Sequence, residues 1–225
     1  VNGVLRAVAR KYSSIHDVSL PDINEQPVEH IGLKYSHPFW MVERWIRNFG
    51  TENTIDLCRY NNQPPVLSVR VNTLKISVED FKELLVDKGI DWERGRLCPE
   101  ALLIKEYGRV EQDDSLRGMY ITQSEPSMLV SRILNPKRGE AVLDACSAPG
   151  SKTTHLAQLM ENKGMILAVD IHESRTKLVK NNCRRLGVSC VKTLVSDSRE
   201  IAKKTNQRFD AVLVDAPCSG TGVLN

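Results

Sequence analysis

Large apolar residues recur at helical spacing in the first part of the chain. Between His37 and Asn48 they repeat every three or four positions, which predicts an amphipathic helix. Ser36 is placed to cap its start and Gly50 to end it, and a second helix, capped by Thr51, is expected to follow. Residues 1–62 are therefore predicted to form a helical segment.

The pattern changes after a Pro-Pro pair at residues 64–65, which is typical of a linker. Apolar and polar residues then alternate over Val66–Val71, which predicts a strand, and Ser77 is placed to cap a helix. Another strand is expected over Ala101–Lys105. These elements predict a small α/β unit over residues 63–112.

Short apolar runs alternate with helical patterns in the last third of the chain. The runs predict strands at Ala141–Asp144, Met165–Asp170, Cys190–Val195 and Ala211–Asp215. Helices are expected between them, at Ser151–Met160, Glu173–Leu186 and Ser198–Lys203. Apolar strands separated by helices are typical of a parallel sheet that is covered on both faces. Residues 113–225 are therefore predicted to form a Rossmann-like, doubly wound α/β domain.

Composition narrows the class of protein. The 225 residues are 41% hydrophobic and 26% charged, which fits a globular protein that buries a core without disulfides or metals. The net charge of +3 is too small to indicate a polyanionic partner by itself. No run approaches the roughly 18 apolar residues of a membrane span. The six cysteines show neither a CxxC pair nor zinc-ligand spacing, so we expect reduced thiols, no metal and a cytoplasmic location.

Aspartates follow the predicted strands of the last domain. They are Asp144, Asp170, Asp197 and Asp215. Ligands of open parallel sheets bind beyond the carboxyl ends of the strands, so acids at these ends predict one binding site. For Asp197 a second interpretation stays open, because it also precedes a predicted helix that it can cap.

The loop after Asp144 indicates the kind of ligand. It contains neither a Walker A pattern nor GxGxxG, which disfavours a nucleoside triphosphatase and a standard nicotinamide dehydrogenase. It keeps Gly150, where backbone can approach a ligand, and Asp170 follows about twenty residues later as a partner for ribose hydroxyls. A ligand with an adenosine group and no pyrophosphate is expected. S-adenosylmethionine fits, because its cations suit a pocket rimmed by carboxylates.

The predicted cofactor site combines this loop with the acids around it. We expect the loop backbone to surround the amino-acid tail of the cofactor, Asp170 to bind the ribose and Asp197 to bind the adenine amino group. The full set of expected cofactor-binding residues is Cys146, Ser147, Ala148, Pro149, Gly150, Ser151, Lys152, Asp170, Arg175, Asp197 and Asp215.

A cysteine follows the last predicted strand in the motif Asp215-Ala-Pro-Cys-Ser-Gly-Thr-Gly222. Proline stiffens this turn and the glycines let a substrate approach the backbone, so Cys218 is expected to be exposed beside the cofactor. A lone cysteine is more often a small buried hydrophobe. The loop around Cys218 favours a reactive thiol instead.

The segment Asp144-Ala-Cys-Ser-Ala-Pro-Gly-Ser-Lys152, together with the Cys218 motif, resembles the RNA 5-methylcytosine methyltransferases of the Sun/Fmu, NOP2 and NSUN group. Gln123, Ser127 and His37-Pro-Phe-Trp40 are similar to further family positions. The first six residues resemble the end of the NusB-like domain in the bacterial 16S ribosomal RNA branch. Ser151 departs from the glycine that is common before the lysine.

This resemblance implies a S-adenosylmethionine-dependent transfer of a methyl group to carbon 5 of cytosine in RNA, after a cysteine thiolate has added to carbon 6. It implies that Cys218 acts in product release and that Asp215 holds the N3/N4 edge of the base. The attacking cysteine of the family lies in a Thr-Cys-Ser motif, expected beyond Asn225. By itself this chain is therefore expected to bind cofactor weakly and not to turn over.

The resemblance further implies that the partner is RNA, ribosomal RNA above all, with an unpaired target cytosine. Residues 63–112 are either an RNA-recognition unit or a packing module. A monomer without metal or membrane contact is expected. Two alternatives stay open: a non-catalytic RNA-binding or ribosome-assembly factor that keeps the cofactor fold, and a methyltransferase that acts on a substrate other than RNA.

Overall fold

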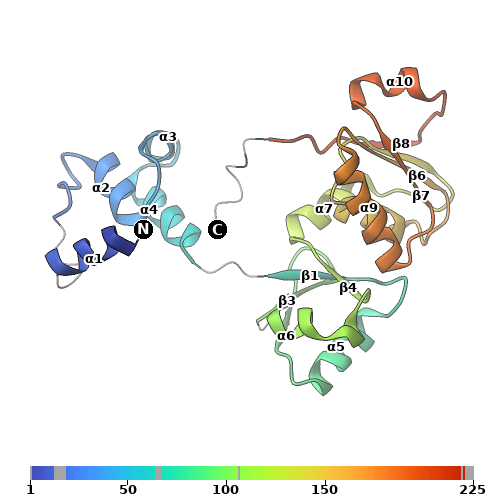
Figure 1. Ribbon diagram of the computed structural model, residues 1–225, viewed down its shortest axis with the longest axis horizontal. Helices are drawn as coiled ribbons and strands as arrows, with labels where there is room; N and C mark the ends of the chain where they lie inside the picture. The colour runs from blue at the N-terminus through green and yellow to red at the C-terminus, as the bar shows by residue number, and fades with distance from the viewer. Residues whose placement is uncertain (1, 13–18, 64–66, 106, 219, 221–225) are drawn as a thin grey trace. The chain divides into compact units, whose positions relative to one another are not determined.

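The computed structural model describes residues 2–12, 19–63, 67–105, 107–218 and 220 of the chain (Figure 1). The chain divides into two compact units, Val1–Pro65 with Thr221–Asn225 and Val66–Gly220. The predicted domain boundaries after residues 62 and 112 stay predictions. The predicted start of a strand at Val66 lies outside the described residues.

The first unit contains helices. They are α1 (Asn2–Lys11), α2 (Pro27–Tyr35), α3 (Phe39–Phe49) and α4 (Thr51–Asn61). Ile31, Val42 and Cys58 are fully buried among them, whereas α1 buries no residue. The amphipathic helix predicted over His37–Asn48 is confirmed as α3.

Two predicted helix caps in this unit are wrong. Ser36 ends α2 in the left-handed conformation, with φ of 59°, and its N–H donates to the carbonyl of Gly32. Pro38 takes the cap position of α3, and Gly50 both ends α3 and precedes α4, so that Thr51 is already helical. The physical reason is that the links between these helices are very short. The residue expected to cap a helix therefore already belongs to the end of the preceding helix or to the helix itself.

The second unit begins with an antiparallel sheet. Its elements are β1 (Ser68–Val71), α5 (Val78–Asp87), β2 (Trp92–Arg94), β3 (Ala101–Ile104), α6 (Tyr107–Gln112), a 3₁₀ turn η2 (Asp114–Leu116) and β4 (Tyr120–Thr122). The strand order is β2-β3-β1-β4, with antiparallel neighbours. This β-α-β-β-α-β arrangement is ferredoxin-like. The predicted cap is confirmed here, because the Ser77 hydroxyl accepts from the N–H of Asp80 at 3.0 Å.

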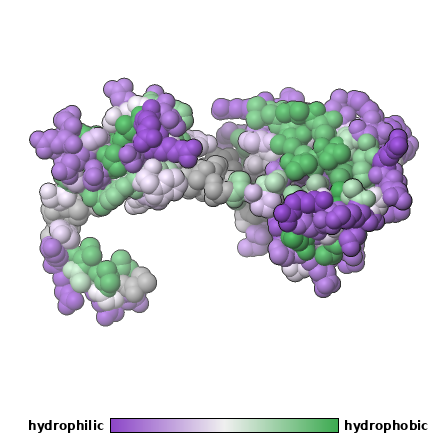
Figure 2. All heavy atoms as spheres, turned by 90° about the horizontal axis from the view of Figure 1, so that it is seen from above, coloured by the Kyte–Doolittle hydropathy of each residue, from purple (hydrophilic) through white to green (hydrophobic). Residues whose placement is uncertain are grey.

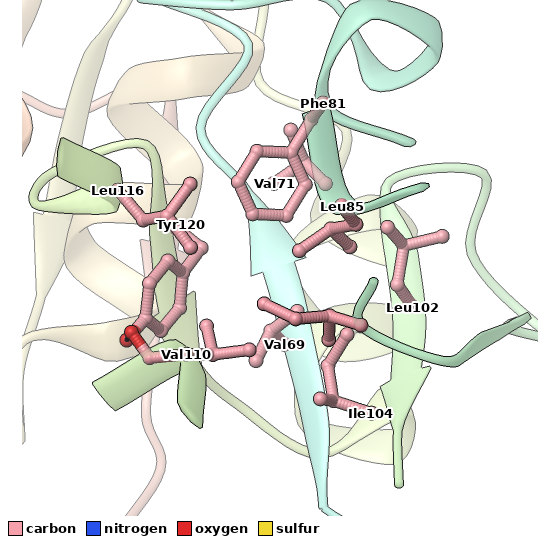
Figure 3. Close-up of a cluster of buried hydrophobic side chains, with 10 residues drawn as sticks. Val69, Val71, Phe81, Leu85, Leu102, Ile104, Val110, Leu116 and Tyr120 are labelled. Atoms are coloured by element: carbon pink, nitrogen blue, oxygen red, sulfur yellow. Dashed lines mark hydrogen bonds between the residues drawn. The ribbon is translucent and has the colours of Figure 1, made fainter. Parts of the chain in front are cut away.

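The antiparallel sheet has an apolar core between its strands and the helices α5 and α6. The core consists of Val69, Val71, Phe81, Leu85, Ile90, Leu102, Ile104, Val110, Leu116 and Tyr120 (Figure 3). Successive strand residues point to opposite faces of a sheet. Because Val69 and Val71 enter this core, Arg70 between them lies on the other face, and it is fully buried there as well.

A parallel sheet follows in the same unit. Its elements are α7 (Glu125–Leu134), β5 (Ala141–Asp144), α8 (Ser151–Leu159), β6 (Met165–Asp170), α9 (Glu173–Leu186), β7 (Val191–Val195), a 3₁₀ turn η3 (Ser198–Glu200), α10 (Ile201–Lys204) and β8 (Ala211–Leu213). The strand order is β7-β6-β5-β8, and all neighbours are parallel. The predicted Rossmann-like fold class is confirmed. The strand order reverses at β5, which places a ligand-binding switch point at its carboxyl end.

The two faces of the parallel sheet are packed differently. On one face Val142 packs against Leu156 of α8 and against Met160, which follows this helix. On the other face Leu143 and Val169 pack against Ile201 and Phe209. Val212 remains 49% exposed on β8. Hydrophobic surface is visible in both compact units (Figure 2). Among the described residues, no helix combines the length and apolar character needed to cross a membrane.

Candidate active site

A cavity of about 670 Å³ lies at the carboxyl edge of the parallel sheet. It is lined by Ala145, Cys146, Ala148, Asp170, Ile171, Arg175, Ser196, Asp197, Ser198, Arg199, Val214, Asp215, Ala216, Pro217 and Cys218. The lining therefore comes from the segments that follow β5, β6, β7 and β8. The structure brings Asp170 and Cys218 to the same cavity, although they lie far apart in the sequence.

The loop between β5 and α8 supplies only part of its predicted residues to this cavity. Cys146 and Ala148 line it, whereas Ser147, Pro149, Gly150, Ser151 and Lys152 are not in the lining. Ser147 instead turns inward, where its hydroxyl donates to the carbonyl of Val169 at 3.0 Å.

The structure gives a packing reason for the glycine at position 150. Its φ is +101°, and a Cβ added there would lie 3.1 Å from the Cα of Val179 on α9. The glycine therefore allows the close packing of the loop against a helix. The expected approach of a ligand to the Gly150 backbone stays a prediction.

Asp170 and Arg175 tie the end of β6 to the loop. Asp170 is only 5% exposed, and its Oδ1 accepts from the N–H of His172 at 3.0 Å. The guanidinium of Arg175 lies 3.6 Å from Oδ2 of Asp170 and donates to the carbonyl of Ala148 at 3.2 Å. One arginine thus links both predicted cofactor-binding segments.

Asp197 caps the 3₁₀ turn η3, as the alternative interpretation held. Its carboxylate accepts from the backbone N–H of Arg199 at 2.9 Å and from the guanidinium of the same residue. These hydrogen bonds lower the pKa of Asp197 to about 2. Asp197 also lines the cavity, so the cap and a ligand-facing position coexist.

Asp144 does not face the cavity, contrary to the expectation that all the strand-end acids converge there. It is 1% exposed, and its Oδ2 accepts from the Thr153 hydroxyl at 2.7 Å. Burial raises its pKa to about 6. The reason is its position at the end of the inner strand β5, where the start of α8 covers the carboxylate and shields it from solvent.

Lys152 and Asp215 form an ion pair beside the cavity. The Nζ of Lys152 donates to Oδ2 of Asp215 at 2.5 Å, and the lysine side chain is the more buried partner, 18% exposed against 49%. Lys152 thus acts on the cavity through Asp215, which lines it.

The two thiols of the lining differ in their surroundings. Burial raises the pKa of Cys146, and the neighbouring carboxylates of Asp144, Asp170 and Asp215 raise it further, which disfavours its thiolate. Cys218 is exposed, and the N–H of Gly220 donates to its Sγ at 3.4 Å. Cys218 is therefore the more accessible nucleophile of the two. The rest of its predicted motif, Ser219 and residues 221–222, lies outside the described residues.

Several lining residues were not predicted from the sequence. They are Ala145, Ile171, Ser196, Ser198, Arg199, Val214, Ala216 and Pro217. Each lies within two residues of a predicted strand-end aspartate or of Cys218. They could have been predicted by including the sequence neighbours of these residues.

The lining suits a ligand with cationic, ribose-like and planar apolar parts. Three carboxylates, of Asp170, Asp197 and Asp215, meet the apolar side chains of Ile171 and Val214 in a space of ordinary ligand size. S-adenosylmethionine has this combination of groups. In the described part of the chain, no cluster of three or more His, Cys, Asp or Glu residues is arranged to hold a metal ion.

Two family models match successive parts of the chain. A family model described as 16S rRNA methyltransferase RsmB/F matches residues 131–225. A second, described as the ferredoxin-like domain of RsmF/B-like methyltransferases, matches residues 37–111. The fold is that of a Rossmann-type methyltransferase preceded by a ferredoxin-like domain.

Individual relatives are similar over most of the chain. A probable ribosomal RNA small subunit methyltransferase B of Bacillus subtilis is 38% identical over all of this chain, which spans 49% of that protein. A tRNA (cytosine(49)-C(5))-methyltransferase of Pyrococcus abyssi is 37% identical over 82% of the chain and 58% of its own length. The chain thus spans about half the length of these curated relatives.

A solved structure shares the fold and bears on the cofactor. The crystal structure of NSun6 from Pyrococcus horikoshii with SFG, an analogue of S-adenosylmethionine, superposes with a TM-score of 0.69 at 25% identity. It covers 79% of this chain and 70% of its own. Both family models match in chain order, and a 38% identical relative aligns over the whole of this chain. The chain therefore belongs to the 16S rRNA methyltransferase RsmB/F family.

Proposed function

We propose that this chain is the cofactor-binding and base-presenting part of a S-adenosylmethionine-dependent RNA (cytosine-C5) methyltransferase. The observation that carries the proposal is the single cavity in which Asp170, Asp215 and the exposed thiol of Cys218 meet. Family membership and the names of the relatives support RNA as the substrate class and carbon 5 of cytosine as the methylated atom.

Asp170, Arg175 and the Cys146–Ala148 backbone are proposed to hold the cofactor. The buried carboxylate of Asp170 is fixed by His172 and Arg175, so it is preorganised to accept from ribose hydroxyls. The carboxylate of Asp197 accepts hydrogen bonds from Arg199. We propose that its remaining lone pairs accept from the adenine amino group. The bound cofactor supplies an electrophilic methyl group.

Asp215 and Cys218 are proposed to act on the base. A carboxylate accepts from the exocyclic N4 amine of cytosine, and Lys152 holds Asp215 in place for this contact. In the proposed reaction a cysteine thiolate bonds to carbon 6, and the electron pair of the 5,6 double bond takes up the methyl group at carbon 5. Removal of the carbon 5 proton then restores the double bond and expels the thiolate.

Cys218 is proposed to serve the release step of this sequence. It is exposed at the cavity, whereas Cys146 has carboxylates around it that oppose a thiolate. The target cytosine must leave its stack to enter a cavity of this size, so an unpaired region of RNA is the expected substrate. The proposed setting is a monomer in the cytoplasm that acts on ribosomal RNA, with transfer RNA as the second candidate because of the archaeal relative.

Cofactor binding is tested on this chain by titration calorimetry with S-adenosylmethionine. Asp170→Asn is expected to weaken binding about 10- to 100-fold, because a charge-assisted hydrogen bond to the ribose is lost. Glu173→Gln is the matched control, since this acid is close in sequence and lies outside the cavity lining. Equal affinities of the wild type and Asp170→Asn would refute the assignment of the ribose site.

The second experiment separates an enzyme from a non-catalytic RNA-binding factor. In the full-length gene product, Cys218→Ala is expected to accumulate a covalent protein–RNA adduct with ribosomal RNA, visible as a shifted band after denaturing electrophoresis. Cys190→Ala is the control, because this thiol is half-buried and lies away from the cavity. A non-catalytic factor gives no adduct with either variant, and transfer of a radiolabelled methyl group to RNA by the wild type would then be absent too.

A further inference from the structure

One face of α8 is polar although the helix is almost wholly buried. Ser151, Thr154, His155 and Gln158 follow the i, i+3, i+4, i+7 spacing of a single helix face. His155 Nε2 lies 2.7 Å from Glu100 Oε1, and the Gln158 side chain donates to the carbonyl of Val71 at 3.1 Å. This face therefore contacts the antiparallel sheet, while the opposite face packs on the parallel one.

Arg70 on β1 reaches the start of this polar face. Its guanidinium donates to the carbonyl of Ser151 at 2.7 Å and to the hydroxyl of Thr154 at 2.9 Å. The Gln123 side chain accepts a further short hydrogen bond from the same guanidinium. The Thr154 hydroxyl in turn donates to the carbonyl of Gly150 at 2.8 Å. Arg70 thus joins the first turn of α8 and the end of the cofactor loop to the antiparallel sheet.

The free-energy cost of burying the Arg70 guanidinium indicates that this side chain does more than fill space. Arg70 is 0% exposed, and its described hydrogen-bond acceptors are all neutral. Burial lowers its pKa to about 9, and the nearby Glu100 carboxylate offsets part of this shift, so that the guanidinium is a cation at neutral pH. A protein with a well-packed apolar side chain at such a position is often as stable as one with a buried charge. Stability alone therefore does not explain an arginine here.

We propose that Arg70 is a positioning residue, which fixes the first turn of α8 and thereby holds the Cys146–Gly150 loop in its cofactor-binding conformation. The inference rests on the proposed cofactor site. It gives the ferredoxin-like sheet a role in shaping that site, through a side chain that lies outside the cavity lining. No contact of Arg70 with cofactor or RNA is required.

Asn72, which directly follows β1, provides a matched control. It is 1% exposed and also joins the two sheets, because its amide donates to the carbonyls of Gly118 and Leu186 at 2.8 Å each. Leu186 is the last residue of α9, at the end of that helix away from the cavity-lining Arg175. Loss of Asn72 weakens the docking of the sheets without releasing the first turn of α8.

The experiment compares Arg70→Met with Asn72→Leu, which both replace a buried polar side chain by an apolar one. Amide hydrogen exchange over residues 150–155 is measured without cofactor, and the Kd of S-adenosylmethionine by calorimetry. Arg70→Met is expected to raise the exchange rates and the Kd about tenfold each, the size of one lost hydrogen bond to a charged group. Asn72→Leu is expected to leave both within about twofold, even where it lowers the Tm.

The inference is overturned if Arg70→Met changes neither quantity, or if both variants change both quantities equally, since general loosening of the docked sheets then suffices. If Arg70→Met does not fold, Thr154→Val removes the hydroxyl between Arg70 and Gly150 and takes its place with the same expectations. A wild type that does not bind S-adenosylmethionine refutes the proposed function, while the exchange rates of the unliganded variants still decide the role of Arg70.

Discussion

The antiparallel and the parallel sheet of this chain both bury their inner strands, but the chemical groups of the cavity lie at the ends of the parallel strands. All residues of β1 are buried, and the antiparallel sheet encloses ten apolar side chains (Figure 3). No residue of β7 is buried, and β8 buries only Leu213. The parallel sheet instead ends in the acids and thiols that line the cavity. The chemistry of this compact unit is thus concentrated at the ends of the parallel strands, whereas both sheets contribute buried apolar side chains.

The antiparallel sheet supports the site although it does not line the cavity. Its apolar face holds the sheet together, and its other face supplies Arg70 and Asn72 to the helices of the parallel sheet. The site is then supported from behind by a firmly packed element, while its own rim stays open to ligands.

Truncation in the antiparallel core has the largest expected effect. Phe81 is fully buried and packs against Tyr120, with ring centroids 6.1 Å apart. Phe81→Ala is expected to lower the free energy of unfolding by about 3–5 kcal/mol, because transfer and cavity terms add. Val212→Ala on β8, where the side chain is 49% exposed, is expected to cost less than about 1 kcal/mol. Urea denaturation followed by circular dichroism measures both, and equal losses would contradict the contrast between the sheets.

The buried titratable groups around the parallel sheet predict opposite pH effects. Burial lowers the pKa of His155 from 6.5 to about 4, so the unfolded chain binds this proton more readily and stability falls as the pH drops through that window. Burial raises the pKa of Asp144 from 3.8 to about 6. The stability from Asp144 is therefore fully present below pH 3.8 and is lost as the pH rises through 6.

Two variants separate these contributions. On going from pH 6.5 to 4, the wild type is expected to lose stability relative to His155→Gln and to gain it relative to Asp144→Asn. Each slope approaches about 1.4 kcal/mol per pH unit at its steepest. Urea denaturation at several pH values measures the differences. Slopes of the same sign for both variants would show that burial does not control these two groups.

The surface of α9 has the smallest expected effect. Lys177 Nζ lies 3.1 Å from Glu173 Oε1 in an i, i+4 pair whose side chains are 65% and 71% exposed. Lys177→Ala is expected to change the free energy of unfolding by less than about 0.5 kcal/mol, because solvent screens such a pair. A loss above about 1 kcal/mol would mean that α9 depends on its outer face as well as on its packing.

Regular patterns in the sequence predicted the longer elements well. The strands at Ala141–Asp144 and Met165–Asp170 and the helix at Glu173–Leu186 have the expected bounds. The two strands are continuous apolar runs that end in an aspartate, and the helix, with 14 residues, is long enough to show its period. The three-residue strand β2 and the six-residue helix α6 were missed, because they are too short to show a period.

The candidate site was predictable in outline only. Acids after apolar strands pointed to the carboxyl edge, and Asp170, Asp197 and Asp215 do line one cavity there. Asp144 follows the same rule in sequence but is buried, and Gly150 serves helix packing. Which strand is central, and what covers its end, depends on contacts between segments far apart in the chain.

The sequence by itself determined the alternation of strands and helices, the acids at the strand ends and the motif around Cys218, because these follow from local order along the chain. Only the tertiary structure decided what Arg70 does. In an alternating strand such a residue is expected to face solvent, yet α8 covers that face of the sheet and turns the guanidinium into a buried hydrogen-bond donor. The physical reason is that burial of a polar residue depends on what packs against its face, and the spacing of residues along the strand contains no information about that.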